Sequence, residues 1–421
     1  MSLASEVDIA IIGAGAAGLG AARTLENSGL NVLVLEARYR VGGRAHTVIA
    51  SENVTFDVGC GWLHSANKNS FVPLAKQLRF EIDQKRPRWR DQTPSIGFPD
   101  DLRTKFLEEL DAFWDRCDAL ALQTDDMPAE RALRPGSRWN PLINALSSYI
   151  SGAELDRVSE KDFAAYEDTE INWRLRRGFG ALVAAYGAKV PVALNTVAST
   201  IDHSGPRVRI ETSQGTILAD KVIVTLPTEI IARENVRFLP ELPAKVAAAA
   251  GLPLGLADKV TLALDRAGDL PVDGHMRGAI DRVGAGSYQI RPFGQPCIEG
   301  YFGGRHARAL EEAGDGALAE AAIEEVVNLL GSDYRKLLRP LASSRWALDE
   351  FALGSYSCAL PGHAPDRAVL AAPVDNRLFF AGEATHPTWF STCHGARDSG
   401  ERAAREALAS VTVAATRAPA S

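Results

Sequence analysis

Cysteine is scarce in this sequence of 421 residues, which holds only five. They lie far apart and form no C-x-x-C pair (Cys60, Cys117, Cys297, Cys358 and Cys393). A zinc site or a disulfide framework needs cysteines at characteristic spacings, so neither is predicted and no metal site is expected. Cysteines that stay reduced fit a cytoplasmic protein.

The sequence also lacks long hydrophobic runs. No run reaches the roughly eighteen apolar residues that a membrane-spanning helix needs, and the tail at 411–421 is polar. The first strand-like segment begins at Val7, which leaves no room for a cleaved signal peptide. We therefore expect neither a membrane anchor nor secretion.

An excess of basic residues is absent as well. Lysine and arginine (46) are outnumbered by aspartate and glutamate (53), so the formal net charge is −7. Nucleic-acid binding requires a clustered basic surface, and this balance argues against it. The apolar fraction of 46% and the charged fraction of 24% are those of an ordinary globular protein, and the length favours about two domains.

The strongest motif stands at the start of the chain. A β-branched run at 7–12, an alanine-rich segment at 16–27 and a second apolar run at 31–36 form a βαβ pattern. The turn between the first strand and the helix reads Gly13-Ala14-Gly15-Ala16-Ala17-Gly18. Glycines at this spacing let the backbone approach a pyrophosphate at the helix N-terminus, and Glu36 ends the second strand where it can bind ribose hydroxyls. This combination predicts a dinucleotide site.

Two further glycines and three arginines follow at once. The segment reads Ala37-Arg38-Tyr39-Arg40-Val41-Gly42-Gly43-Arg44. It offers a second backbone approach to phosphate and bidentate guanidinium contacts.

Near the other end of the chain, a short strand leads into Gly382 and Glu383. A helix begins near Thr392, so the N-terminus of that helix can face negative charge.

These segments resemble the flavin amine oxidase superfamily, which includes monoamine, polyamine and L-amino acid oxidases and a histone demethylase branch. The E-A-R-x-R-x-G-G-R string and the A-G-E-A-T-H segment match its two FAD motifs. The closest motif resemblance is to animal-type polyamine oxidases. It is carried by the segments at 59–64 (GCGWLH), 257–260 (ADKV), 346–357 (W…GSYS) and 389–396 (WFSTCHGA). The stretch at about 76–170 carries no family motif.

The resemblance implies FAD as the cofactor. Non-covalent binding is expected, because Ser355 stands where monoamine oxidases carry the cysteine that bonds to the flavin. The expected cofactor-binding residues come from five parts of the chain: Gly13, Gly15, Ala17, Gly18; Glu36, Ala37, Arg38, Gly42, Gly43, Arg44; Gly61, Trp62; Val197; and Gly382, Glu383, Ser391, Thr392.

The resemblance also implies four catalytic residues. Lys259 would hold a water at flavin N5, and His64 would hydrogen-bond an amine. Tyr356 would form one wall of the substrate pocket. Thr392 would line it where the family has a second tyrosine, so the usual aromatic pair is incomplete.

The fold expected is α/β, with a Rossmann-like FAD-binding domain built from residues 1–75, 190–250 and 350–421. An inserted substrate-binding domain of sheet plus helices would comprise 76–189 and 251–349. Helical patterns stand at 103–122, 317–330 and 393–409, and short strands at 207–211, 216–219, 222–226 and 377–381.

The function expected is oxidation of an amine. Hydride passes from its α-carbon to flavin N5, the imine is hydrolysed, and dioxygen reoxidises the flavin to give hydrogen peroxide. Polyamines are favoured, with monoamines or L-amino acids as alternatives; an amino acid would need an arginine such as Arg174 or Arg291. A desaturase, a protoporphyrinogen oxidase or a non-enzymatic escort of prenylated GTPases remain open on the same scaffold. The oligomeric state is open between monomer and homodimer.

Acidic residues that could bind the distal nitrogens of a polyamine are not evident. The candidates by location are Asp100, Asp101, Glu167, Asp168 and Glu170. A solvated acidic face is the favoured interpretation of these side chains.

Overall fold

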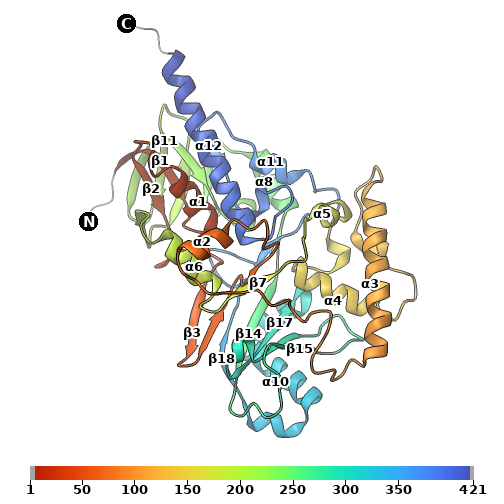
Figure 1. Cartoon of the computed structure of the whole chain (residues 1–421). Coiled ribbons are helices and arrows are strands. Elements are labelled where there is room, and N and C mark those ends of the chain that lie inside the picture. The colour runs from red at the N-terminus through yellow and green to blue at the C-terminus, as the bar shows by residue number, and fades with distance from the viewer. Residues whose placement is uncertain (1–4, 418–421) are drawn as a thin grey trace.

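The computed structural model describes residues 5–417. Its largest sheet has eight strands and forms the upper part of Figure 1. In spatial order these are β12 (Arg237–Leu239), β9 (Ala198–Asp202), β10 (Val208–Thr212), β11 (Gly215–Val224), β1 (Glu6–Ile12), β2 (Val32–Leu35) and β8 (Val192–Ala193), with β20 (Leu378–Phe380) also paired to β11. The pairs of β1 with β2 and β11, of β11 with β20 and of β2 with β8 are parallel, as in a Rossmann-like sheet.

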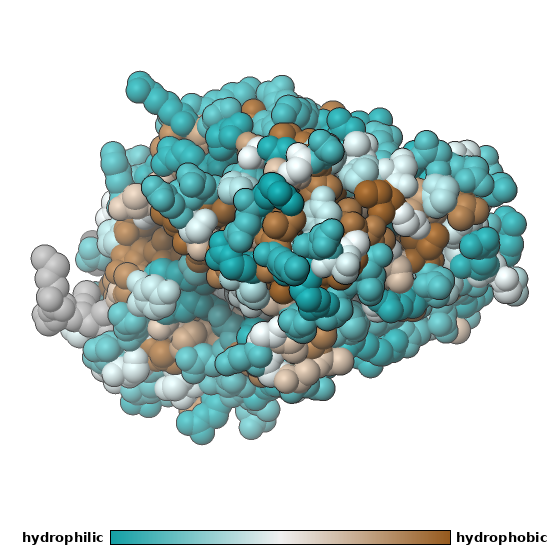
Figure 2. Space-filling model, turned by 90° about the horizontal axis from the view of Figure 1, so that it is seen from below, coloured by the Kyte–Doolittle hydropathy of each residue, from teal (hydrophilic) through white to brown (hydrophobic). Residues whose placement is uncertain are grey.

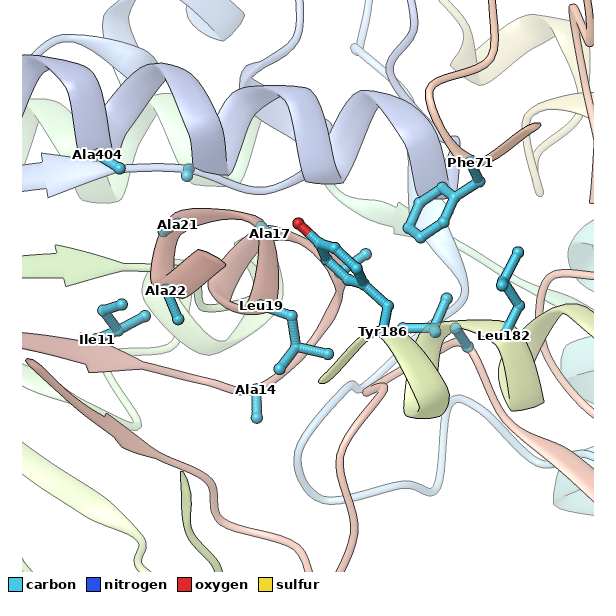
Figure 3. Packing of buried hydrophobic residues seen from close by; sticks show 14 of the residues in the cluster. Ile11, Ala14, Ala17, Leu19, Ala21, Ala22, Phe71, Leu182, Tyr186 and Ala404 are labelled. Atoms are coloured by element: carbon cyan, nitrogen blue, oxygen red, sulfur yellow. The ribbon is translucent and has the colours of Figure 1, made fainter. Parts of the chain in front are cut away.

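Strand β1 shows why this sheet is buried on both faces. Its side chains alternate between two apolar layers, Ile9 and Ile11 on one side and Ala10 and Ile12 on the other. The first layer packs under α1 (Ala16–Thr24), α2 (Phe71–Gln77), α6 (Phe179–Gly187) and α12 (Cys393–Arg417), and Figure 3 shows α1 beside α12 and Tyr186. The second layer packs under α7 (Thr228–Ala232), α8 (Pro243–Gly251) and α11 (Asp366–Ala371).

A second, five-stranded antiparallel sheet lies in the lower part of Figure 1. Its order is β15 (Gly274–Arg277), β16 (Ser287–Ile290), β17 (Cys297–Gly303), β14 (Ala257–Leu264) and β18 (Leu338–Ser343). One face is apolar and packs on α10 (Ala317–Leu330), next to α9 (Gly304–Glu312). The opposite face is polar and is covered in part by α4.

The helical region on the right of Figure 1 has its own core. It comprises α3 (Asp100–Ala121), α4 (Asn140–Ile150) and α5 (Glu160–Ala165), with the 3-10 turns η1 (Ala129–Ala132) and η2 (Leu155–Arg157). The other 3-10 turns are η3 (Pro292–Gly294), η4 (Ser332–Lys336) and η5 (Glu383–Thr385).

Three small sheets connect these parts. They are β3 (Thr47–Ser51) with β4 (Val54–Asp57); β5 (Trp62–Leu63) and β6 (Ile82–Asp83) on either side of β7 (Trp173–Leu175); and β13 (Leu254–Gly255) with β19 (Tyr356–Ser357).

The structure confirms the α/β fold class and most of the predicted elements. Helices predicted at 103–122, 317–330 and 393–409 correspond to α3, α10 and the start of α12. One prediction was wrong: the segments at 216–219 and 222–226 are not two strands but one, β11, because Asp220 and Lys221 continue the extended backbone with their charges directed outward. The domain boundaries remain a prediction, and α6, from the segment assigned to the substrate domain, packs on α1 in the first layer.

The surface seen from below in Figure 2 is mixed: hydrophobic residues stand in separate groups among hydrophilic ones. Within residues 5–417, no helix combines the length and the apolar character needed to cross a bilayer.

Candidate active site

The glycine loop after β1 leaves its backbone open. Helix α1 starts after Gly15, and a Cβ placed on Gly15 would meet no atom within 4 Å. At Gly18 the opposite holds, because a Cβ there would lie 1.9 Å from the Gly13 carbonyl oxygen. The N–H groups of the first helical turn have no acceptor within the helix, so they can bind an anion such as a pyrophosphate.

The loop after β2 meets this first loop. The Gly42 N–H donates to the Ala14 carbonyl at 2.8 Å, and a Cβ on Gly43 would lie 3.3 Å from the Gly15 Cα. Gly42 and Gly43 have φ values of 99° and 58°, which favour glycine. The two glycine segments predicted to bind one cofactor therefore lie side by side.

Glu36 ties the two loops together. Its buried carboxylate accepts the Ala14 N–H at 2.7 Å through one oxygen and the Arg38 N–H at 2.9 Å through the other. Each carboxylate oxygen has a second lone pair, which leaves room for a ribose hydroxyl. The Arg38 guanidinium pairs with Asp349. Ala37, between Glu36 and Arg38 in the sequence, is half-buried.

Arg44 and Glu383 connect the N-terminal and C-terminal motifs, which are 339 residues apart. The Arg44 guanidinium donates to Glu383 Oε1 at 2.9 Å and to the Ser355 carbonyl at 2.8 Å. Glu383 also accepts from Ser357 Oγ at 2.7 Å and from the Ser391 N–H at 2.9 Å. Burial alone would raise the pKa of this carboxyl, but the Arg44 charge and the hydrogen bonds outweigh it and hold the pKa below its ordinary value.

Gly382 and Thr392 shape the backbone on either side of Glu383. Gly382 has φ 137°, and a Cβ there would meet no atom within 4 Å, so this strand end is open to a ligand. Thr392 Oγ1 accepts the Gly395 N–H at 3.0 Å and donates to the Trp389 carbonyl at 2.6 Å. Thr392 is thus held at the start of α12, although a role in catalysis stays a prediction.

Lys259 reaches from β14 to the segment at 57–61. Its Nζ donates to the carbonyls of Asp57, at 3.2 Å, and of Gly59. It lies 3.3 Å from where a Cβ on Gly61 would stand, so the ammonium packs closely against this glycine. The predicted lysine therefore lies next to Gly61, a predicted cofactor residue.

His64 and Trp62 line the same region from β5 and the turn after it. His64 Nδ1 lies 2.7 Å from Asn172 Oδ1, an acceptor, so Nδ1 carries the proton and Nε2 is left as an acceptor. Burial lowers the pKa of His64, which keeps the ring neutral at pH 7. The Trp62 and Trp89 rings pack edge to face, with centroids 4.7 Å apart.

Tyr356 has a partner that the sequence did not reveal. The Tyr301 and Tyr356 hydroxyls lie 2.7 Å apart, and Tyr356 donates to the Tyr149 carbonyl. Tyr301 faces Lys259 across the β14–β17 pair, with the ammonium 5.8 Å from its ring centroid. Burial raises the pKa of Tyr301 to about 12, so both phenols stay protonated. The alternation of β17 was the signal that could have identified Tyr301.

Ser355, which stands where monoamine oxidases carry the flavin-linking cysteine, and Val197, a predicted cofactor residue, both make hydrogen bonds within the protein. The Ser355 hydroxyl donates to the Ala257 carbonyl and accepts the Ala257 N–H, both at 2.9 Å. The Val197 N–H donates to Ser213 Oγ at 3.0 Å, so a cofactor contact through that group would require this bond to open.

The acidic candidates lie on the surface, as the favoured interpretation predicted. Asp100 and Asp101 are exposed in the first turn of α3, and Glu167, Asp168 and Glu170 are exposed in the segment after α5. None is among the buried residues around Lys259.

Comparison with known proteins identifies the family of the chain. The family model for flavin containing amine oxidoreductase matches residues 16–128 and 96–408. The chain belongs to this family and is an oxidoreductase that acts on amines, with a flavin as the cofactor.

The relatives in sequence include plant polyamine oxidases. Polyamine oxidase 4 of Oryza sativa subsp. japonica is 28% identical over 96% of this chain and 89% of its own length. Polyamine oxidase 2 of Arabidopsis thaliana is 29% identical over 94% and 87%. A lysine-specific histone demethylase 1 homolog of rice is 28% identical over 94% of this chain but only 52% of its own length.

Solved structures share the fold. A putrescine oxidase variant made in a redesign of cofactor binding has a TM-score of 0.79 at 18% identity, covering 97% of this chain and 100% of the other. Cyclohexylamine oxidase from Brevibacterium oxydans IH-35A has a TM-score of 0.77 at 20% identity, covering 96% and 99%. The Rossmann-like flavoprotein fold is therefore shown.

Proposed function

We propose that the chain is an FAD-dependent amine oxidase whose favoured substrates are polyamines or their acetylated forms. The observation that carries the proposal is the contact between Arg44 and Glu383, which joins the two predicted FAD motifs from opposite ends of the chain. Similarity to two plant polyamine oxidases supports the substrate class.

The residues present fit FAD. The open backbone at Gly15 and the helix N-terminus behind it suit a pyrophosphate, and Glu36 retains acceptor capacity for ribose hydroxyls. The open strand end at Gly382 extends this site towards Glu383. Binding is proposed to be non-covalent, because the Ser355 hydroxyl is bonded to the Ala257 backbone.

The chemistry that FAD supplies when bound is hydride uptake at N5 from the amine α-carbon and reoxidation by dioxygen, which yields hydrogen peroxide. The protein residues prepare the amine. His64 Nε2 can accept a hydrogen bond from the amine nitrogen, and the Tyr356–Tyr301 pair is a rigid wall beside Lys259. The substrate reacts with a neutral nitrogen, since its lone pair stabilises the iminium that forms, and water hydrolyses the imine to a carbonyl compound.

Replacement of Lys259 by methionine tests the proposed site. We expect Lys259→Met to keep its FAD while turnover or reoxidation slows at least about tenfold, because the ammonium that would hold a reactive water is lost. Anaerobic and aerobic stopped-flow absorbance separates flavin reduction from reoxidation. Lys336→Met, at an exposed position, is the control; equal kinetics in both variants would remove the role of Lys259.

The substrate class is tested with a panel. Spermine, spermidine, acetylated spermidine, benzylamine, cyclohexylamine and L-amino acids are mixed with the enzyme without oxygen, and the fastest to bleach the flavin band identifies the class. A monoamine or an L-amino acid oxidase is the first alternative. Against the latter, Arg174 is already stacked 4.9 Å from Trp62 and paired with Asp273 at 3.5 Å.

A desaturase, a protoporphyrinogen oxidase or an escort of prenylated GTPases is the less favoured alternative. A desaturase or protoporphyrinogen oxidase has no need of a lysine at the position of Lys259, and an escort protein would not need the flavin-side segment at Gly382 and Glu383. A purified protein that remains colourless after reconstitution with FAD would overturn the oxidase proposal.

A further inference from the structure

The polar face of the second sheet is unusual for a surface inside a protein. Because paired residues in an antiparallel sheet share a face, the register sets two polar rows across the strands. One row is Arg277, Ser287, Tyr301 and Lys259; the other is His275, Gln289, Glu299 and Thr261. The first row contains the proposed catalytic lysine, and the second lies directly beside it.

Two groups of the second row lack hydrogen-bond partners. His275 Nδ1 is buried and has no hydrogen bond within the described part of the chain. The Glu299 carboxylate has no hydrogen bond or ion pair there either, and it interacts with its neighbours only through charge. Glu299 nevertheless keeps part of its surface accessible, as a side chain that can meet a ligand must.

The other carboxylates of this region already accept hydrogen bonds from the protein. Asp57 accepts N–H groups from Phe179, at 2.9 Å, and Gly180, at 3.1 Å. Asp273 accepts from Lys85 Nζ at 2.8 Å and from the Phe293 N–H at 2.7 Å. Among the described residues, Glu299 is therefore the carboxylate beside Lys259 that accepts no hydrogen bond.

The cations that face Glu299 are held elsewhere. Lys259 donates to two backbone carbonyls of the segment at 57–61, and Arg174 lies between the rings of Trp62 and Phe293 and next to Asp273. Burial raises the pKa of the Glu299 carboxyl; the charges of Arg174 and Lys259 oppose that rise, and the like charge of Asp57 adds to it. A largely buried carboxylate without a partner costs free energy unless a cation pairs with it.

We propose that Glu299 binds a second, protonated nitrogen of the substrate and so selects diamines and polyamines over monoamines. This inference rests on the proposed amine oxidase function. Glu299 is diagonal to Lys259 across β14 and β17, where side chains stand roughly 7–8 Å apart. A nitrogen separated by a few methylene groups from the reacting amine spans that distance.

The test compares two substrates of equal carbon length, 1,4-diaminobutane and n-butylamine. Replacement of Glu299 by glutamine keeps the shape of the side chain and removes its charge. We expect the KM for 1,4-diaminobutane to rise about tenfold to hundredfold, since a charge-assisted hydrogen bond is lost, while kcat/KM for n-butylamine stays within about twofold. Glu299→Asp, which keeps the charge, should recover part of the affinity.

A binding measurement accompanies the kinetics. 1,4-Diaminobutane should raise the Tm of the wild-type holoenzyme more than n-butylamine does, and Glu299→Gln should abolish the difference. Glu320→Gln, on the exposed face of α10, is the matched control and should behave as wild type.

The outcomes separate the two proposals. Equal losses for both substrates in Glu299→Gln, or a wild-type enzyme that oxidises n-butylamine as well as the diamine, would overturn the role of Glu299 and leave the oxidase intact. A flavin-loaded wild type that oxidises no amine would overturn the proposed function itself.

Discussion

Asp258, one residue before Lys259, points to the opposite side of β14 and is fully buried. Its Oδ1 accepts from Ser344 Oγ at 2.7 Å, and the same Oγ accepts the Lys259 N–H at 2.8 Å. Its Oδ2 and Glu311 Oε2 have no other donor among the described residues. Burial, and then the hydrogen bond and charge of Glu311, raise the pKa of Asp258 to about 8, which is the behaviour expected of two buried carboxyls that share a proton.

This shared proton predicts a specific pH dependence of stability. In the unfolded chain Asp258 titrates near its ordinary value of 3.8, whereas in the folded protein it titrates near 8. Between these values the folded state holds a proton that the unfolded state has lost, so this carboxyl lowers the free energy of unfolding as pH rises. Asp258→Asn, whose amide can donate to Glu311 at any pH, should remove that slope. Urea unfolding from pH 5 to 8 measures it.

Histidines with lowered pKa values, such as His275 and His394, have the opposite effect: below their ordinary pKa, they raise the free energy of unfolding as pH rises. The informative quantity is therefore the difference in unfolding free energy between the wild type and Asp258→Asn. As pH rises, the free energy of unfolding of Asp258→Asn should increase relative to that of the wild type. Parallel curves would show that the two carboxyls do not share a proton.

Individual site residues could be predicted only where their role depends on local sequence. Gly15, Gly18 and Glu36 belong to one βαβ unit, and their spacing alone places them. Glu299 and Tyr301 were missed because their importance arises from the register of β17 against β14, which fixes which side chains face Lys259.

At the scale of elements, α1 and α12 pack with their backbones in contact. A Cβ on Gly400 of α12 would lie 1.9 Å from the Ala17 carbonyl oxygen, and one on Gly20 would lie 2.7 Å from the Arg397 carbonyl oxygen. Glycine at these positions lets the C-terminal helix cover the helix that carries the proposed phosphate site (Figure 3).

We expect Gly400→Ala to lower the free energy of unfolding by about 1–3 kcal/mol, because the added methyl meets backbone rather than a movable side chain. FAD content should fall with it, since α1 must shift. Thermal unfolding and the flavin-to-protein absorbance ratio are the measurements. Gly205→Ala, where the nearest atom would be 3.6 Å away, is the control, and equal effects at both positions would contradict this packing argument.

Helices with a strong apolar period, such as α3 and α10, could be predicted almost to their ends. The length of β11 could not, because its polar residues Asp220 and Lys221 interrupt the apolar pattern. These two residues stay in the strand since β1 and β10 supply backbone partners along it, which is tertiary information.

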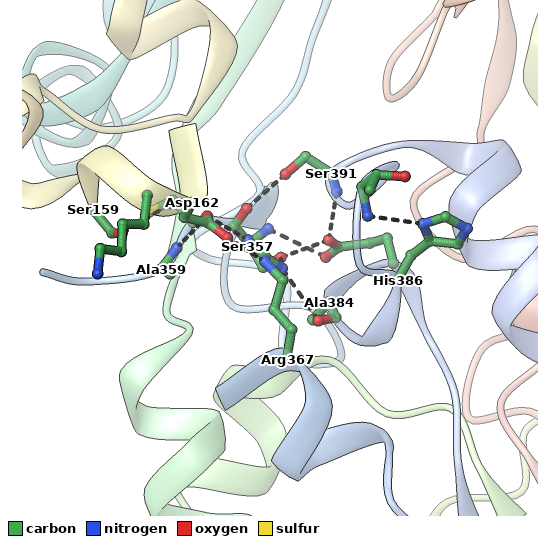
Figure 4. Close-up of polar contacts among 12 residues, drawn as sticks. Ser159, Asp162, Ser357, Ala359, Arg367, Ala384, His386 and Ser391 are labelled. Atoms are coloured by element: carbon green, nitrogen blue, oxygen red, sulfur yellow. Dashed lines mark hydrogen bonds and ion pairs between the residues drawn. The ribbon is translucent and has the colours of Figure 1, made fainter. Parts of the chain in front are cut away.

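At the scale of the whole molecule, a buried ion pair joins the helical region to the cofactor motif. Arg367 donates to both carboxylate oxygens of Asp162 in α5, at 2.6 and 2.8 Å, and to Ser357 Oγ at 2.9 Å. Ser357 in turn donates to Glu383. Figure 4 shows Arg367, Asp162 and Ser357 converging from separate segments.

Breaking this pair should destabilise the protein by about 3–5 kcal/mol, because Asp162→Asn leaves the Arg367 charge buried without its partner. Equilibrium unfolding in urea checks the value. Glu229→Gln, which breaks a partly exposed pair with Arg233, should change stability little. A loss in Asp162→Asn no larger than in this control would show that the buried pair is not needed.

The pairing of Asp162 with Arg367 could not be predicted, since 205 residues separate them and neither belongs to a motif. The association of the two FAD motifs could be predicted despite a longer separation, because both matched one cofactor. Long-range contacts were accessible from sequence only through a shared ligand.

Strand β20 pairs with β11 and helix α12 covers α1, so the N-terminal unit needs C-terminal elements to complete its fold during synthesis. Ribosomes add about 5–20 residues per second, so roughly 20–75 seconds separate the emergence of the first βαβ unit from that of its last helix. During that interval the face of α1 that α12 will cover has no partner. That face is therefore exposed until translation is nearly finished, and we expect chaperones to bind it during synthesis.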